Sequence, residues 1–247
     1  EKARRLVDLV TVSVLLDAGA GPTWQYVSAD GGSHRASEGL AVASLDMFCE
    51  GLFSSDPAMK SRVNSYALTN LDDERLARGL QVSRQNMLAG FQGRTKLLKQ
   101  LGAALDANPE FFGTELVRPG NMVDFLLSKA QDGKVGLEFL WQVCAQGFAS
   151  IWPKQSNGIL QGDIWTHSKL QMSGEPGSDL VPFHKLTQWL VYSLIDALQV
   201  SIGLEVTGID KLTCLAEYRN GGLLVDTGVI KLKDESWLSQ EVNVGTE

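Results

Sequence analysis

The sequence predicts a mainly α-helical protein that forms a single domain with one small β-hairpin. Apolar residues recur at helical spacing through most of the chain, and the strand patterns are few and short. No stretch of the 247 residues has the composition of a linker between two domains. The chain opens at Glu1 inside an amphipathic pattern and closes at Glu247 without a helix stop signal, so we expect the single domain 1–247 to be cut at both ends from a longer protein.

The individual elements follow from the apolar periodicity and from the residues that interrupt it. Residues 2–16 are apolar on most sides and predict a buried helix, which Asp17 and the glycine- and proline-containing stretch 18–22 terminate. Residues 23–37 predict a hairpin around an Asp-Gly-Gly turn, and residues 152–178 predict a long irregular loop of the kind that is often functional. Further helical patterns begin at Ser37 and extend over 70–79, 94–105, 122–130, 137–148, 183–200 and 209–229.

The composition limits the class of partner. A formal net charge of −7 leaves no basic stripe for a nucleic acid or for an anionic membrane surface, although a small anionic substrate remains compatible with it. No apolar run approaches the ~20 residues that a membrane-spanning helix needs, and no secretory signal opens the chain. The cysteines Cys49, Cys144 and Cys214 are odd in number and widely spaced, which predicts reduced, buried thiols in a cytoplasmic protein.

The sequence also lacks the motifs of the common cofactor sites. It has no phosphate-binding P-loop, and its lone Gly-Ala-Gly element at 19–21 follows a helix rather than the strand that a dinucleotide site requires. The histidines His34, His167 and His184 are scattered, so a metal centre would need carboxylates to complete it. We therefore expect neither a metal nor an organic cofactor and a small molecule as partner, and the oligomeric state stays open.

The first candidate site is the start of the helix predicted over 183–200. His184 and Lys185 stand at its amino end, where the helix dipole disfavours a lysine, so the lysine indicates a purpose other than helix stability. Helical spacing places Gln188 one turn after His184 and Trp189 one turn after Lys185, which makes both candidates for substrate contact. A solvated lysine beside a capping histidine is the alternative, which the residues alone favour.

The second candidate site is Glu217, which lies among the apolar residues 215, 216 and 218. An apolar surround raises the pKa of a carboxyl group unless a cation offsets the loss of hydration. Arg219 and Lys185 are the cations available for that purpose. The alternative is an ordinary surface pair of Arg219 with Glu217 or Asp226.

Two further acidic residues are candidates for substrate binding. Asp163, Trp165 and His167 lie within five residues of the predicted loop, and this mixture of acid, aromatic ring and imidazole is typical of a ligand-facing segment. A turn around a buried tryptophan is the alternative. Asp17 stands at a helix carboxyl end, where the dipole disfavours an acid, and capping of the glycine turn is its alternative role.

Four long motifs resemble a known family. They are Val-Ser-Val-Leu-Leu-Asp-Ala-Gly-Ala-Gly-Pro at 12–22, Ser-Glu-Gly-Leu-Ala-Val-Ala-Ser-Leu-Asp-Met-Phe at 37–48, Pro-Phe-His-Lys-Leu-Thr-Gln-Trp-Leu at 182–190 and Glu-Tyr-Arg-Asn-Gly-Gly-Leu at 217–223. The chain resembles the URC-type uracil-catabolism family over nearly its whole length. The resemblance implies a pathway that opens the uracil ring while it is still attached to ribose. The implied step is hydrolysis of ribosylurea, or its 5′-phosphate, to urea and the sugar.

A weaker resemblance connects two of these segments with the queuosine 5′-phosphate glycosylases. Those enzymes carry Phe-Tyr-Lys-Arg-Ala-Gln and, further along the chain, Thr-Met-Phe-Ala-Asp-Tyr-Arg, and residues 183–188 and 213–219 are similar to them. The resemblance implies a helical fold like that of helix-hairpin-helix DNA glycosylases. It also implies that Lys185 and Glu217 act at the ribose. Glu217 stands where that family has aspartate, so its carboxylate reaches one methylene further.

The chemistry of the implied reaction suggests a role for each candidate. Cleavage of an N-glycosidic bond builds positive charge on the ribose, and a carboxylate, here Glu217, can stabilise that charge and activate water. Lys185 would hold the sugar hydroxyls or tune the carboxylate by its charge. The leaving nitrogen needs a proton, for which His184, Asp163 and His167 are the candidates.

The remaining candidates would shape the pocket. Trp189, Trp165 and Trp24 can wall it, and Arg219 suits a substrate phosphate. Three other functions compete with hydrolysis of ribosylurea. The change from aspartate to glutamate motivates a nucleoside-binding protein of the same fold without hydrolysis, and a nucleosidase for another small nucleotide shares the implied chemistry. The negative net charge disfavours the third, a DNA glycosylase.

Overall fold

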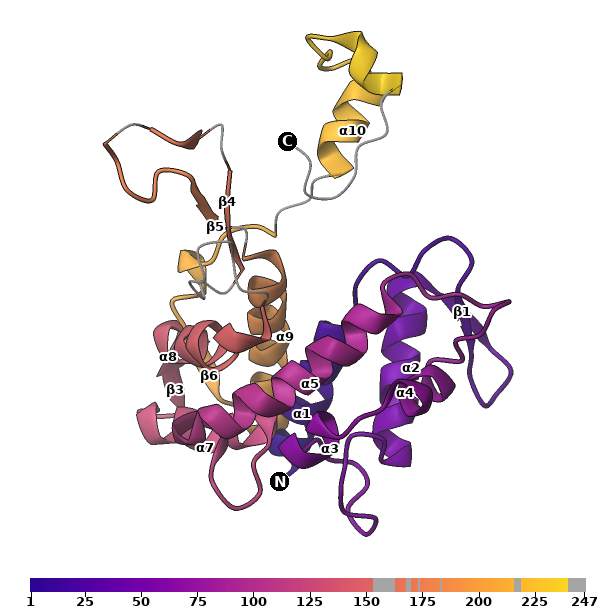
Figure 1. Ribbon diagram of the computed structural model, residues 1–247. Coiled ribbons are helices and arrows are strands. Elements are labelled where there is room, and N and C mark those ends of the chain that lie inside the picture. Colours follow the sequence, from indigo (N-terminus) through magenta and orange to yellow (C-terminus); the bar gives the residue numbers. More distant parts are fainter. Residues whose placement is uncertain (153–162, 168–169, 173, 183, 216–218, 240–247) are drawn as a thin grey trace.

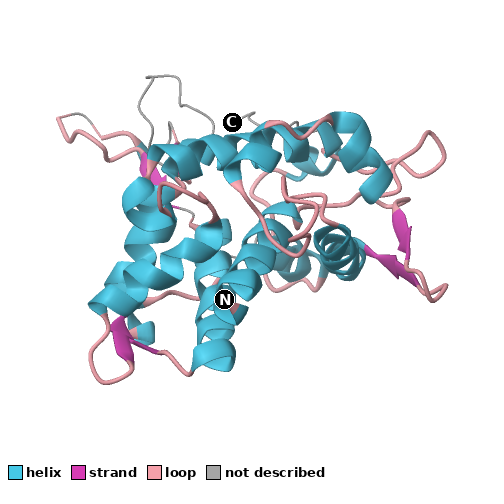
Figure 2. Ribbon diagram, turned by 90° about the horizontal axis from the view of Figure 1, so that it is seen from below, coloured by secondary structure: helices cyan, strands magenta, loops and turns pink. Residues whose placement is uncertain are grey.

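The computed structural model shows a helical body with short strand pairs at its periphery (Figures 1 and 2). It describes residues 1–152, 163–167, 170–172, 174–182, 184–215 and 219–239. The predicted class, mainly α with a small β-hairpin, is confirmed. The likeness to DNA glycosylases stays a prediction.

The chain forms its elements in the following order. The α-helices are α1 (Lys2–Leu16), α2 (Ala36–Glu50), α3 (Ser65–Thr69), α4 (Asp73–Gly79), α5 (Phe91–Ala107), α6 (Pro109–Phe112), α7 (Met122–Lys129), α8 (Leu137–Gln142), α9 (Lys185–Ile202) and α10 (Arg219–Asp226). The strands are β1 (Gln25–Val27), β2 (Ser33–Arg35), β3 (Lys134–Gly136), β4 (Ile164–Thr166), β5 (Leu180–Pro182) and β6 (Glu205–Thr207). Short 3-10 or π turns are η1 (Pro119–Asn121), η2 (Val143–Gly147), η3 (Ala149–Ile151), η5 (Ile209–Lys211) and η6 (Glu235–Ser239).

The helix α1 lies at the centre of the body, as its apolar sequence predicts. It packs against α9, α2, α5 and α7, and Val7, Val12 and Leu16 are fully buried among them. Figure 1 shows α5 crossing the body in front of α1. A helix that is apolar on most sides is stable only where neighbours cover it on most sides, and α1 has these neighbours.

The hairpin predicted at residues 23–37 is confirmed by β1 and β2, which pair antiparallel with Tyr26 opposite His34. A second antiparallel pair, β4 with β5, places Trp165 opposite Val181. This second pair falls partly inside residues 152–178, which we predicted to be irregular. The strands β3 and β6 pair in parallel and join two distant parts of the chain.

The sequence prediction of one helix over 209–229 is wrong, because η5 and α10 are separate. Between them, Thr213 bonds to a side chain rather than to a helical backbone partner: its N–H donates to Oε1 of Gln188 over 2.9 Å. Figure 1 shows α10 apart from the body, beyond the amino end of α9. The expectation that all three thiols are buried is also wrong, because Cys49 and Cys214 are exposed and only Cys144 is buried.

A buried ion pair anchors the amino-terminal half of α1. Asp8 is inaccessible to solvent, and its Oδ2 atom accepts hydrogen bonds from Nε and Nη2 of Arg118 over 2.9 and 2.5 Å. The backbone N–H groups of Val63 and Gly120 donate to the same carboxylate over 2.9 and 2.7 Å. Burial raises the pKa of Asp8 from 3.8 to about 6, although Arg118 and the hydrogen bonds act in the opposite direction. Asp8 is therefore charged at neutral pH and depends on Arg118 for compensation.

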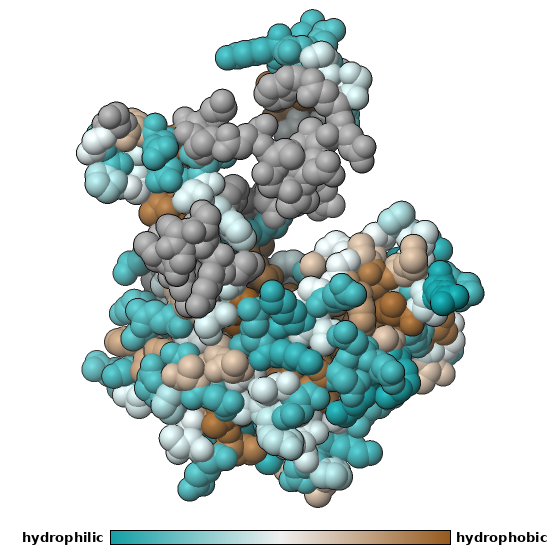
Figure 3. All heavy atoms as spheres, in the orientation of Figure 1, coloured by the Kyte–Doolittle hydropathy of each residue, from teal (hydrophilic) through white to brown (hydrophobic). Residues whose placement is uncertain are grey.

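The surface of the body is mostly polar on the face drawn in Figure 3, where hydrophilic residues surround small, separate hydrophobic patches. In the part of the chain that the structure describes, no helix has the length and the apolar character needed to cross a membrane.

Candidate active site

The candidate site lies where the carboxyl end of α1 meets the amino end of α9. The two helices pack together, and Leu15 near the end of α1 lines the same crevice as Leu186 in the first turn of α9. The other residues of this crevice are mostly apolar: Cys144, Phe148, Ile151, Trp152, Thr187 and Leu190. The arrangement brings Asp17, which follows α1, to the same end of the body as His184, which precedes α9.

The sequence-predicted residues Asp163 and His184 meet at this end. Ile164 lies opposite Pro182 in the antiparallel β4–β5 pair, so the residue before β4 approaches the residues after β5. The Oδ1 atom of Asp163 is hydrogen-bonded to Nδ1 of His184, and its Oδ2 atom accepts a hydrogen bond from the Thr187 hydroxyl over 2.8 Å. Asp163 is 5% exposed, so its carboxylate is largely removed from water and depends on these partners.

The backbone of His184 has an unusual conformation, and its ring contacts an aromatic side chain. Its φ angle is 44°, in the left-handed region that is uncommon for a residue with a side chain, and such residues cluster at functional sites. The indole of Trp141 lies edge-on to the imidazole, with 5.3 Å between the ring centroids. A carboxylate oxygen accepts hydrogen bonds, so Nδ1 carries the proton that faces Asp163. Nε2 is then the ring nitrogen that takes no part in the contact with Asp163.

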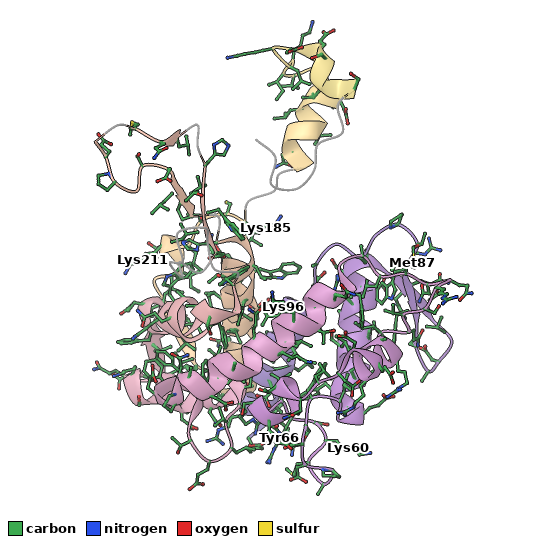
Figure 4. All side chains as sticks on the ribbon, viewed as in Figure 1. Lys60, Tyr66, Met87, Lys96, Lys185 and Lys211 are labelled. Carbon is green, nitrogen blue, oxygen red and sulfur yellow. The ribbon has the colours of Figure 1, made fainter. Side chains whose placement is uncertain are left out.

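Lys185 is the first residue of α9 and directly follows His184. Figure 4 shows its side chain at the amino end of α9, directed away from the helical body. The predicted contact of Lys185 with substrate stays a prediction. The structure thus brings together two of the predicted site residues, Asp163 and His184, and Lys185 follows His184 directly in the chain.

Asp17 is half-buried, and one of its carboxylate oxygens accepts a hydrogen bond from the Ser37 hydroxyl over 2.9 Å. The pKa of Asp17 is raised above its ordinary value, because the effect of burial exceeds the opposing effects of the hydrogen bond from Ser37 and the positive charge of Arg94. The side chain therefore connects the end of α1 with the start of α2. It also leaves part of the carboxyl group accessible at the end of the body where His184 lies.

Arg94 is a buried cation beneath Asp17 that the sequence analysis missed. Its guanidinium donates to the carbonyl oxygens of Leu16, Ala18 and Gly19 over 3.0, 2.9 and 3.3 Å, and also to that of Ala89. The carbonyls of Leu16, Ala18 and Gly19 belong to the end of α1 and the turn after it, where a helix leaves acceptors without helical partners. Arg94 therefore fixes the path of the chain at residues 16–19 and supports the position of Asp17.

Replacement of Arg94 by methionine should lower the free energy of unfolding by about 1–3 kcal/mol for each carbonyl group that loses its donor without gaining water. Chemical denaturation measures the loss. The matched control is Lys96→Met on the same helix, because Lys96 is exposed and its loss should change stability by less than about 0.5 kcal/mol. Equal effects of the two substitutions would contradict the assigned role of Arg94.

Gln188 is buried in the second turn of α9, and its amide group is occupied by Thr213. Besides the bond from the Thr213 N–H, its Nε2 atom lies 2.9 Å from the Thr213 hydroxyl. The Tyr192 hydroxyl donates to the Thr213 carbonyl oxygen over 3.1 Å. Together these contacts hold the chain before α10 against α9. The predicted contact of Gln188 with substrate stays a prediction.

The structure also shows the surroundings of the other predicted site residues. Trp165 on β4 is 40% exposed, so the alternative of a turn around a buried tryptophan is wrong. His167 is exposed, and its backbone N–H donates to the Asp179 carbonyl oxygen over 2.8 Å. Trp189 is half-buried and packs against the hydrophobic core. Trp24 is a core residue whose indole N–H donates to the Leu80 carbonyl oxygen over 2.9 Å, so we do not count it as a wall of the pocket.

Two predicted site residues are described only in part or not at all. Glu217 lies outside the described residues. Arg219 is described only as the first residue of α10, without its side chain. Across the described ranges, no group of three or more histidine, cysteine, aspartate or glutamate side chains is arranged to hold a metal ion.

Sequence reasoning missed Arg94, Trp141 and Thr187. Arg94 stands in a basic stretch with Lys96 and Lys99, whose side chains are exposed or near the surface, so its burial has no local signal. Trp141 is one of two aromatic residues in α8, and no local pattern distinguishes it as a site residue. Thr187 does lie inside the motif 182–190, and that position is the available signal.

Two curated proteins are similar to the chain over nearly its whole length. It is 43% identical over 251 residues to Uracil catabolism protein 4 of Lachancea kluyveri, a match that covers 96% of this chain and 57% of that protein. It is 41% identical over 239 residues to Protein urg3 of Schizosaccharomyces pombe, covering 95% of this chain and 55% of that protein. The chain thus spans little more than half the length of these relatives. A family model matches residues 1–246, and the chain belongs to that family, which is described as Protein of unknown function (DUF1688).

Proposed function

We propose that this chain belongs to an N-glycoside hydrolase of uracil catabolism that cleaves ribosylurea, or its 5′-phosphate, to urea and the sugar. The name of the Lachancea kluyveri relative supports the pathway, and the motif resemblance supports the type of reaction. The observation that carries the chemistry is the buried Asp163 carboxylate, which holds His184 by Nδ1 and is itself held by Thr187. A carboxylate-oriented imidazole is an arrangement suited to proton transfer.

The proposed step breaks the bond between the anomeric carbon and the urea nitrogen. The bonding electron pair leaves with the nitrogen, and Nε2 of protonated His184 donates the proton that completes urea. Positive charge develops on the ribose ring, where a nearby carboxylate stabilises it. Water adds to the anomeric carbon and loses a proton to a base. We assign stabilisation of charge and activation of water to Glu217, because of its place in the motif.

Other side chains would bind the substrate. Lys185 and the accessible part of Asp17 suit the ribose hydroxyl groups, because they supply a donor and an acceptor at the same end of the body. Trp165 and Trp189 suit the walls of the pocket, and Arg219 suits a 5′-phosphate. His167 remains the other candidate for the proton donor.

The test is release of urea from synthetic ribosylurea and its 5′-phosphate, with uridine and its 5′-phosphate as controls. Rapid release from one form of ribosylurea would support the proposal and settle whether the substrate carries a phosphate. The assay needs the longer protein as well as this chain, because the relatives extend well beyond the matched region.

Two outcomes would replace the proposal. Cleavage of uridine or of its phosphate, with ribosylurea left intact, would identify a nucleosidase of a different specificity. Binding of these compounds without cleavage, detected as a rise in melting temperature, would identify a binding protein of the same fold. A Glu217→Gln protein that keeps full activity would remove Glu217 from the mechanism while leaving the proposed reaction in place.

A further inference from the structure

Thr187 in the first turn of α9 and His184, the residue directly before the helix, contact the same carboxylate. His184 lies outside the helix with a left-handed backbone, so helical spacing does not place its ring beside Thr187; the shared contact with Asp163 does. The imidazole contacts Oδ1 of Asp163, and the Thr187 hydroxyl donates to Oδ2 over 2.8 Å. Asp163 and Thr187 are 5% and 6% exposed, so water has little access to the hydroxyl–carboxylate contact.

The hydrogen bond of Thr187 differs from the usual bond of a threonine in a helix. A helical threonine commonly donates its hydroxyl proton to the carbonyl oxygen four residues earlier. Thr11 in α1 does this, with its hydroxyl 2.8 Å from the Val7 carbonyl oxygen. Thr187 instead directs its single proton to a side chain from another element. A bond from a hydroxyl to a carboxylate is also stronger than a bond between neutral groups.

This contact fixes the orientation of the carboxylate. The two oxygens of Asp163 are rigidly connected in one plane, so a donor that holds Oδ2 also determines where Oδ1 points. The position of Oδ1 in turn determines which imidazole nitrogen carries the proton, because a carboxylate accepts and does not donate. Loss of the hydroxyl would let the carboxylate rotate and would leave its Oδ2 atom buried without this donor.

We infer that Thr187 is a positioning residue of this site: its hydroxyl holds Asp163 in the orientation that keeps the proton of His184 on Nδ1 and presents Nε2 to the substrate. The inference rests on the proposed function for its effect on the reaction. Its effect on the imidazole is independent of which reaction the protein performs. The two effects can therefore be tested separately.

The first test compares three variants in the urea-release assay with the longer protein. Thr187→Val keeps the shape of the side chain but removes the hydroxyl, and we expect kcat to fall about 10- to 100-fold, the cost of slight misplacement of a reacting group, with KM changed less than about twofold. Thr187→Ser keeps the hydroxyl and should restore kcat to within about threefold of the original protein. Thr11→Val is the matched control, since it removes an equally buried hydroxyl with a bond of the same length, and it should leave kcat unchanged.

The second test measures directly which nitrogen of the His184 imidazole carries the proton. The chain has three histidines, so nitrogen NMR of their rings is simple to interpret, and His184→Gln assigns the signals of His184. At a pH where the ring is neutral, the original protein and Thr187→Ser should show a protonated Nδ1 with a bare Nε2. Thr187→Val should show a mixture of the two tautomers. Thr11→Val should show the same single tautomer as the original protein, with the proton on Nδ1.

The outcomes separate the two proposals. If no substrate is cleaved but Thr187→Val changes the tautomer, the proposed function fails and the positioning role stands. If urea is released and Thr187→Val keeps both kcat and the Nδ1–H tautomer, the proposed function stands and the positioning role is overturned. A loss of kcat in Thr11→Val equal to that in Thr187→Val would also overturn it, because general destabilisation would then explain both.

Discussion

The His184→Gln protein is expected to lose about 10²- to 10⁴-fold in kcat for urea release, the usual contribution of a general acid. Glutamine can still donate a hydrogen bond toward Asp163 from its amide, but it cannot exchange a proton at the pH of the reaction. Steady-state kinetics on ribosylurea or its phosphate measures the effect. KM should change little if the imidazole acts mainly in the transition state.

Two companion variants sharpen this prediction. Asp163→Asn presents an amide to Nδ1 and favours the opposite tautomer, so it should cost a similar factor in kcat while preserving the fold. His34→Gln is the control, because His34 lies on the β1–β2 hairpin, where it contacts Ser28 and Glu38. Full activity of His184→Gln, together with inactivity of His167→Gln, would transfer the role of proton donor to His167.

The Arg118→Met protein is expected to be less stable by about 3–5 kcal/mol at neutral pH, the usual cost of leaving one charge of a buried pair without its partner. Arg118 is 1% exposed, and its guanidinium also donates to the Glu1 carboxylate over 3.0 Å. Denaturation by urea, followed by circular dichroism, measures the difference in unfolding free energy. Arg4→Met is the control: Arg4 pairs with Asp124 at the surface over 2.7 Å, and such pairs contribute about 0–1 kcal/mol.

The loss caused by Arg118→Met should depend on pH in a defined direction. The pKa of Asp8 in the folded protein, about 6, lies above its ordinary value of 3.8, so the stability linked to this group is fully present below pH 3.8 and is lost as the pH rises through 6. Without the arginine, folding must either bury a charge or keep Asp8 protonated, and protonation becomes easier in acid. The variant should therefore lose more stability at pH 8 than at pH 5. An equal loss at both values would contradict the assigned ionisation of Asp8.

The parts of the fold that the sequence predicted have complete local signals. Residues 2–16 carry an apolar pattern followed by a glycine turn, and α1 has these same bounds. The hairpin at 23–37 has its turn residues between two strand patterns, and it forms as expected. The helix predicted at 183–200 appears as α9, displaced by two residues at each end.

The parts that the sequence did not predict depend on contacts between distant segments. Asp163 and His184 were identified as separate candidates, but their hydrogen bond follows from the register of β4 against β5, which no local pattern reveals. The helix predicted at 209–229 fails for a similar reason. Its apolar spacing is helical, yet Gln188 from another helix takes the N–H group of Thr213.

The central position of α1 has a consequence for how the protein folds during its synthesis on the ribosome. The helix α1 ends at Leu16 and its main partner α9 begins at Lys185, so 168 residues lie between them. At a synthesis rate of about 5–20 residues per second, α1 must wait roughly 10 to 30 s before α9 is available to cover it. During that time the side of α1 that packs against α9 is exposed to other nascent chains. A need for chaperones at high expression follows from this long separation of the two helices in the sequence.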